Sequence, residues 1–231
     1  MTSYAYLRPE QLLSDQTLVM SRPFPFLVAH DILSDMEREA LEKAYPKLEE
    51  PGYFPYVPEE CGPAVRRLVE EITSPEVADA LGDRLGIPKL SQYPTLVSIC
   101  RSLNRRHGTI HTDSKSKVAT ALVYLNEDWD QTSDGCLRFL DGSDNIDRLL
   151  VPEVKPLFGN FAMFKRTDNS FHGHLPYEGE RRVIQIAWIV NADEMNRKIR
   201  RGRFSRWIKG LFKETDRKLG AERGRNAAHL D

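Results

Sequence analysis

The stretch Gly108-Thr-Ile-His-Thr-Asp-Ser114 places a histidine and a carboxylate two residues apart in a segment with the pattern of a β-strand. Alternate side chains of a strand point to the same face, so we expect His111 and Asp113 to lie side by side. An imidazole nitrogen and a carboxylate oxygen are two of the three ligands of a facial iron site. A His-x-Asp tripeptide also occurs by chance as a surface hydrogen-bonded pair. A metal site therefore requires a third ligand from elsewhere in the chain.

The sequence around this stretch alternates with a period of two from about Leu90 to Val190. Turn signals separate eight short candidate strands, which is typical of a sandwich or jelly roll. The candidate strands are 96–102, 109–113, 119–125, 136–140, 149–154, 160–165, 170–174 and 182–190.

The first third of the chain has mainly helical patterns. A capping box of Ser34 and Glu37 predicts a helix that stops before Pro46. Two further helices are expected over 64–73 and after Ser74, which has the character of an N-cap residue.

These patterns predict a single α+β domain over residues 1–195. Its helical layer, 30–90, would pack on one sheet of a jelly-roll core at 90–195. We expect 49–63 to be an irregular loop, and we assign it no chemistry. Residues 196–231 would form a basic amphipathic C-terminal extension.

The composition excludes several classes of protein. The 33 basic and 34 acidic residues nearly cancel, so the charge of the whole chain predicts neither nucleic-acid nor membrane binding. Three widely spaced cysteines argue against a disulfide framework or a cysteine zinc site. The N-terminus lacks the pattern of a signal peptide, and no apolar run approaches the roughly 18 residues of a spanning helix. We therefore expect a cytoplasmic protein.

The third ligand is expected in Phe171-His-Gly-His174, the remaining histidine cluster. His172 and His174 are two residues apart, so they share a face of a strand and periodicity alone does not choose between them. Downstream, Arg182 alternates in phase with Ile184, Ile186 and Trp188.

Arg182 lies on what we interpret as the apolar face of a buried strand. A buried guanidinium is costly to desolvate unless it holds an anion, and its planar fork suits a carboxylate. A salt bridge to a protein carboxylate is the alternative.

Together these residues resemble the prolyl-hydroxylase-like branch of the Fe(II)- and 2-oxoglutarate-dependent dioxygenases. The family pattern is His-x-Asp, a distal His, and Arg or Lys nine or ten residues later. Here it corresponds to His111-Thr-Asp113, His172 and Arg182. The segments 119–129 and 134–140 also resemble the family's strand ending in Tyr-Leu-Asn and its Gly-Gly-x-Leu-Arg strand.

The resemblance implies a double-stranded β-helix in which His111, Asp113 and His172 hold Fe(II). It implies that Arg182 pairs with the distal carboxylate of 2-oxoglutarate and that Tyr124 donates a hydrogen bond to it. The implied reaction consumes dioxygen, releases succinate and carbon dioxide, and usually hydroxylates a substrate. Ascorbate would be a supporting reductant.

Two features depart from the family pattern. Cys136 follows Gly135 where the second glycine is expected. Family members often place a tyrosine about ten residues before the first histidine, and this chain has Cys100-Arg101-Ser102 there.

The tail is strongly polarised. Residues 197–225 contain twelve basic and three acidic residues, a local charge of +9 against a total of −1. Phe204, Trp207, Ile208, Leu211 and Phe212 have the spacing of an amphipathic helix. Packing on the chain's own domain is favoured slightly over an anionic membrane surface, which would make the protein peripheral. Nucleic acid is the least favoured partner.

The sequence therefore predicts an iron- and 2-oxoglutarate-dependent hydroxylase. A peptidyl proline, a saccharide or lipid-linked sugar, and a small metabolite remain open as substrates. The alternatives are a catalytically silent cupin-like binding module and a membrane-associated scaffold that uses the basic tail.

Overall fold

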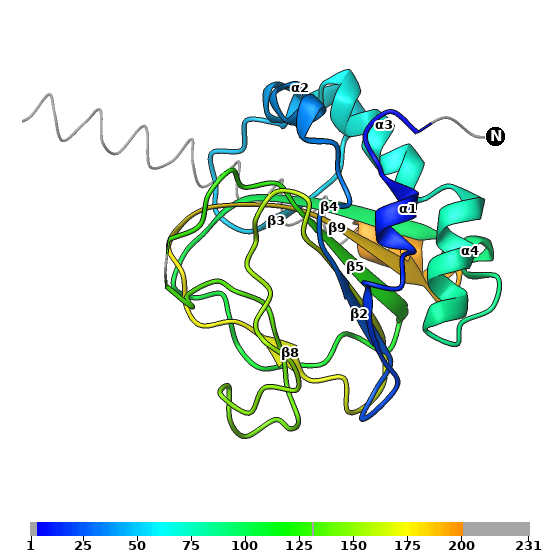
Figure 1. The fold of residues 1–231 in the computed structure, drawn as a ribbon, viewed down its shortest axis with the longest axis vertical. Helices are drawn as coiled ribbons and strands as arrows, with labels where there is room; N and C mark the ends of the chain where they lie inside the picture. The colour runs from blue at the N-terminus through cyan, green and yellow to red at the C-terminus, as the bar shows by residue number, and fades with distance from the viewer. Residues whose placement is uncertain (1–3, 131, 201–231) are drawn as a thin grey trace, which may run out of the picture. The chain divides into compact units, whose positions relative to one another are not determined.

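The computed structural model describes residues 4–130 and 132–200. Its centre is a seven-stranded antiparallel sheet with the strand order β1-β2-β7-β5-β9-β4-β3 (Figure 1). In that order the strands are β1 (Leu18–Met20), β2 (Phe26–Ala29), β7 (Phe161–Lys165), β5 (Lys117–Tyr124), β9 (Gly179–Ile189), β4 (Thr95–Leu103) and β3 (Tyr53–Pro55). A second sheet pairs β6 (Arg138–Phe139) with β8 (His172–Gly173).

The helices gather on one face of the large sheet (Figure 1). They are α1 (Pro9–Leu12), α2 (Arg38–Ala44), α3 (Pro63–Ile72) and α4 (Pro75–Arg84), with short 3₁₀ turns at Asp35–Glu37, Pro58–Glu60 and Leu90–Gln92. Both α3 and α4 begin with proline, which suits a first helical position because its missing N–H would have no partner there. Ser74 caps α4 by accepting a hydrogen bond from the backbone of Val77, as predicted.

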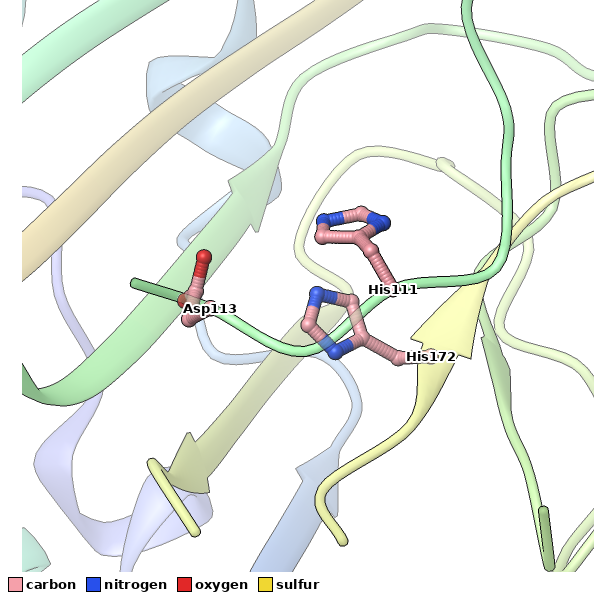
Figure 2. A group of neighbouring side chains, drawn as sticks. All are labelled: His111, Asp113 and His172. Atoms are coloured by element: carbon pink, nitrogen blue, oxygen red, sulfur yellow. The ribbon is translucent and has the colours of Figure 1, made fainter. Parts of the chain in front are cut away.

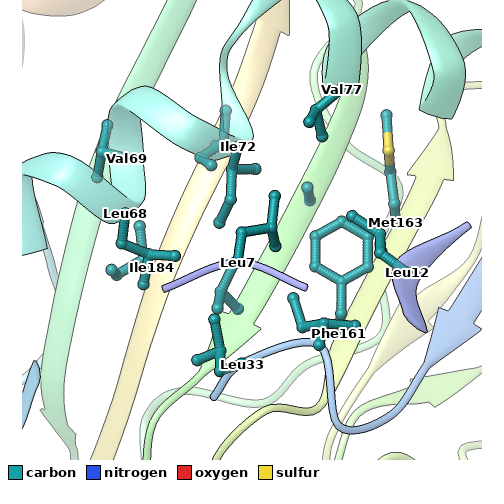
Figure 3. Packing of buried hydrophobic residues seen from close by; sticks show 14 of the residues in the cluster. Leu7, Leu12, Leu33, Leu68, Val69, Ile72, Val77, Phe161, Met163 and Ile184 are labelled. Carbon is teal, nitrogen blue, oxygen red and sulfur yellow. The ribbon is translucent and has the colours of Figure 1, made fainter. Parts of the chain in front are cut away.

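The main core fills the space between the helices and this face of the sheet (Figure 3). Leu68 and Ile72 of α3 are fully buried there, together with Phe161 of β7 and Ile184 of β9. The apolar residues of α3 recur every three or four positions and therefore lie on a single side of the helix, which explains how one short helix covers several strands.

The opposite face of the sheet looks toward β6 and β8. A second cluster there joins Phe26 and Phe164 of the large sheet to Phe139 of β6. The rings of Phe26 and Phe139 lie 4.3 Å apart between centroids. The predicted arrangement of a jelly-roll-like β core with helices packed on one sheet is confirmed.

Several predicted elements differ from the structure. Segments 109–113 and 149–154 contain isolated bridges instead of strands, because the partners in the second sheet are only two residues long. Ser34 makes no side-chain cap, since the N–H of Glu37 donates to the Ser34 carbonyl in a tight turn and α2 starts at Arg38. The predicted loop 49–63 contains β3.

The contacts group Met1–Met195 as one compact unit, apart from Asn196–Asp231. The predicted amphipathic helix of the tail lies outside the described residues. Within residues 4–130 and 132–200, no helix is both long and apolar enough to cross a membrane.

Candidate metal centre

His111, Asp113 and His172 converge on one point, although they come from two distant segments (Figure 2). Each offers a ligand atom, and these atoms lie within 4.8 Å of one another. An isolated antiparallel bridge between His111 and His172 brings the segments together, with hydrogen bonds in both directions. Gly173 permits this approach, because a side chain there would meet the Thr109 carbonyl at 2.8 Å.

Backbone carbonyls fix the tautomers of both histidines. Nδ1 of His111 lies 2.9 Å from the Thr109 carbonyl, and Nδ1 of His172 lies 3.0 Å from the Ser170 carbonyl. A carbonyl oxygen can only accept, so each Nδ1 carries the proton and each Nε2 keeps a lone pair. Metal-binding histidines are oriented in this way, with the second nitrogen donating to a neighbour.

Asp113 is held as an ionised carboxylate. Lys117 Nζ lies 2.7 Å from one carboxylate oxygen, and the Thr120 hydroxyl donates to the other. Burial raises the pKa of Asp113, but Lys117, the nearby His172 and these hydrogen bonds outweigh it, and the net pKa is lowered. Each oxygen retains lone-pair capacity for a cation.

His172 is kept neutral by its surroundings. It is only 6% exposed, and its ring packs against Phe164 at 4.3 Å between centroids. Burial lowers its pKa to about 4, which more than offsets the attraction of Asp113. Two neutral imidazoles with free Nε2 atoms and one ionised carboxylate form a donor set that fits a divalent iron.

The three side chains border a cavity of about 420 Å³. Leu122, Leu137 and Phe164 give it apolar walls, and the guanidinium of Arg181 lies on the same lining. The cavity therefore combines a candidate metal centre with a buried cation.

Arg181 is 1% exposed and has no carboxylate partner among the described residues. Its Nε donates to the Gly135 carbonyl at 2.8 Å, Nη1 donates to the Tyr53 hydroxyl at 3.2 Å, and Nη2 is 3.5 Å from the Tyr124 hydroxyl. All three acceptors are neutral. A buried charge left with neutral partners is costly, and this cost would be offset by an anionic ligand.

Arg182, which the sequence prediction placed in this pocket, points away from it. Its guanidinium pairs with Glu180 at 2.6 Å and with Glu42 of α2 at 3.8 Å. The prediction of an apolar face was sound, because Ile184 and Ile186 do lie in phase with Arg182 in a core. That core is the one under the helices, so the in-phase arginine faces protein carboxylates instead of the cavity.

Arg182 borders a different cavity, of about 490 Å³, whose lining includes Glu127, Asp128, Asp130 and Glu180. None of the three converging residues lines it. This cavity is the larger of the two, but its carboxylates would repel an anionic ligand. We therefore place the chemistry in the smaller cavity.

Tyr124 is fully buried, and its hydroxyl lies near the guanidinium of Arg181. Tyr53 was missed, because it lies in the segment expected to be an irregular loop. Burial raises the pKa of both tyrosines, so both remain protonated donors at neutral pH. The spacing could have found Arg181, since it lies nine residues after His172. No local signal pointed to Tyr53.

His174, the alternative histidine, lines the cavity but is not one of the three converging residues. Its Nδ1 lies 2.7 Å from the Leu175 carbonyl. Gly108 makes room for it, because a side chain there would lie 2.7 Å from the ring.

Comparison with known proteins places this geometry in context. Residues 97–190 match the model of the 2OG-Fe(II) oxygenase superfamily. A search among curated protein sequences finds no significant match.

The solved structures with a similar fold include two prolyl hydroxylases. A prolyl-4-hydroxylase from Pseudomonas putida aligns with a TM-score of 0.51 at 18% identity, covering 72% of this chain and 93% of that one. A prolyl hydroxylase from Trichoplax adhaerens, solved with a peptide fragment of the hypoxia inducible factor oxygen degradation domain, aligns with a TM-score of 0.50 at 16% identity. That alignment covers 75% of this chain and 86% of the other.

The superfamily implies Fe(II) and 2-oxoglutarate, and the donor set above fits that iron. Residues 97–190 thus match the model of the 2OG-Fe(II) oxygenase superfamily, and the fold is similar to that of the prolyl hydroxylases.

Proposed function

We propose that this protein is an Fe(II)- and 2-oxoglutarate-dependent dioxygenase that hydroxylates its substrate. Nε2 of His111, Nε2 of His172 and a carboxylate oxygen of Asp113 would hold the iron. Bound iron would supply the oxidative decarboxylation of 2-oxoglutarate to succinate and carbon dioxide, coupled to oxidation of the substrate.

The observation that carries this proposal is the uncompensated guanidinium of Arg181 in the cavity of the three converging residues. Its fork suits a carboxylate, and it selects a dicarboxylate because a simple 2-oxo acid has no second charge to offer. Arg181 takes the role that the sequence prediction gave to Arg182, and it keeps the family spacing to His172.

The remaining residues of the cavity prepare the site. The carbonyls behind His111 and His172 hold both rings in the tautomer that a metal needs. Lys117 and Thr120 keep the Asp113 carboxylate ionised and oriented. Phe164 packs against the ring of His172 and forms an apolar wall of the cavity.

A catalytically silent module with this fold is the competing hypothesis. It would have no need of the fixed tautomers, the ionised carboxylate and the unpaired arginine at the same time. Iron-dependent release of succinate from 2-oxoglutarate, even without a substrate, would exclude the silent module. Absence of any such turnover in protein shown to bind iron would refute the dioxygenase.

The ligand assignment is tested by exchanging the two histidines of the His-Gly-His segment in turn. We expect His172→Ala to lose iron and all turnover, because the donor set falls to two side chains. His174→Ala should retain close to one iron per chain, as measured by metal analysis after dialysis. Retained iron in His172→Ala, with loss in His174→Ala, would reverse the assignment.

Several substrate classes remain candidates. The two structures compared above are prolyl hydroxylases, and a fold shared at 16–18% identity says little about the substrate pocket. One panel of compounds would be tested for each class: peptides with proline, saccharides including lipid-linked sugars, and small metabolites. Substrate-stimulated release of succinate is the signal to measure.

A further inference from the structure

The inner face of the large sheet contains a continuous row of four residues. Tyr53 of β3 pairs with Cys100 of β4, Cys100 pairs with Val183 of β9, and Val183 pairs with Tyr124 of β5. Residues paired across antiparallel strands have their side chains on the same face. Arg181 precedes Val183 by two residues and therefore shares this face, with one tyrosine at each end of the row.

Both tyrosine hydroxyls accept hydrogen bonds from the same guanidinium. Tyr53 accepts from Nη1 and Tyr124 lies near Nη2, at 3.2 and 3.5 Å. A phenol oxygen that accepts from arginine keeps its own proton to donate elsewhere. Each tyrosine could therefore add one donor to a carboxylate bound at Arg181.

The two tyrosines differ in what their side chains contact. Tyr53 lines the cavity beside Arg181, and the residue as a whole is 39% exposed. Tyr124 is fully buried and is absent from the lining. A ligand in the cavity can therefore reach Tyr53, while Tyr124 lies behind the guanidinium.

The small side chain of Cys100 explains why the ring of Tyr53 fits on the inner face of the sheet. It is the small side chain directly opposite Tyr53, in the region where the family often has a tyrosine on β4 itself. A large aromatic residue at position 100 would compete for the same space on the inner face. The short thiol leaves this space to a ring from the edge strand.

We propose that Tyr53, which lies outside the matched segment 97–190, donates a hydrogen bond to the distal carboxylate of the bound 2-oxo acid. Tyr124 holds Arg181 in position from behind and makes no contact with that carboxylate. This inference rests on the proposed function, and it replaces the direct role that the sequence prediction gave to Tyr124.

The experiment measures binding of 2-oxoglutarate to the full chain by calorimetry, without oxygen and with Mn²⁺ in place of iron. The variants are Tyr53→Phe, Tyr124→Phe and, as a matched loss of a hydroxyl on the same segment, Tyr56→Phe, which borders a different cavity. A hydrogen bond to a charged group predicts that Tyr53→Phe weakens binding about tenfold or more. Tyr124→Phe should have a smaller effect, and Tyr56→Phe should bind as the wild type does.

A second ligand separates a direct contact from a structural effect. The monocarboxylate 2-oxobutanoate lacks the distal carboxylate, so Tyr53→Phe should leave its binding unchanged and reduce the preference for 2-oxoglutarate about tenfold. An equal loss for both ligands, or a larger loss in Tyr124→Phe, would overturn the proposal. If the wild type binds no 2-oxoglutarate, the proposed function fails; if it binds and Tyr53→Phe is unaffected, only the role of Tyr53 fails.

Discussion

Arg181 and Arg182 are consecutive residues of β9, but they lie in two different environments. The inward side of the strand contains Arg181 and Val183 and borders a partly hollow space next to the candidate metal centre. The outward side contains Arg182 and Ile186 and is packed against the helical layer. The outward arginine is neutralised by protein carboxylates, and the inward one is not.

This difference shows why the position of an arginine on an apolar strand face is not by itself evidence of a ligand site. Arg182 begins an apolar face, but Glu42 and Glu180 already balance its charge. Arg181 shares the opposite face with Val183 and Gln185, and the hydrogen bonds of its guanidinium go only to neutral oxygens. The charge of Arg181 that no carboxylate among the described residues balances is the evidence for a ligand site, and it can be recognised only from the contacts in the folded structure.

The largest expected effect comes from replacing each arginine in turn. Arg181→Ala should weaken 2-oxoglutarate binding by about 100-fold or more, because it removes a buried guanidinium whose fork suits a carboxylate. Arg182→Ala should change that binding by less than about threefold, since Arg182 does not line the cavity and its charge is already paired with Glu180 and Glu42. Titration with Mn²⁺ and 2-oxoglutarate, without oxygen, measures both. The reverse order would restore the role first given to Arg182.

A smaller effect is expected from shortening one apolar side chain on each face. Ile186→Ala removes three carbons from the fully buried core under the helices and should lower the free energy of unfolding by about 2–5 kcal/mol. Leu122 borders the cavity, so fewer contacts are lost in Leu122→Ala, and the free energy of unfolding should fall by about half as much.

Urea unfolding monitored by circular dichroism compares the two variants. Equal losses of stability would mean that the inward face is packed as tightly as the outward one. That outcome would contradict a preformed cavity of the size described.

The sequence predicted the parts of this architecture that depend on local pattern. The period of two located β4, β5, β7 and β9, and the helical layer followed from N-cap and proline signals. His111, Asp113 and His172 were predicted to lie together, and the structure brings them together through a bridge instead of the expected strand. The three side chains converge as soon as the segment with His111 lies beside the segment with His172, and the resemblance to the family already implied that arrangement.

The parts that were missed depend on contacts between distant residues. A period of two assigns residues to faces, but it does not say which face meets the helices and which meets the cavity. Arg182 was therefore chosen in place of Arg181. Tyr53 acquires its role from the pairing of β3 with β4, across more than forty residues of sequence. Its surroundings of proline and glycine gave only the pattern of a loop.

The smallest difference between the two faces is expected for the reactivity of their thiols. Cys61 packs in the core under the helices, while Cys100 lies in the inward cluster, and both are free and buried. Burial raises the pKa of the Cys61 thiol to about 11 and that of Cys100 to about 12. The thiolate is the reactive form, so at pH 8 the native protein should react with iodoacetamide far more slowly than the unfolded chain at both positions. Mass spectrometry of a labelling time course measures each site. Rapid labelling of Cys100 alone would mean that the inward face opens to solvent more readily than the outward face, and that the row linking Tyr53 to Tyr124 is not held rigidly before a ligand binds.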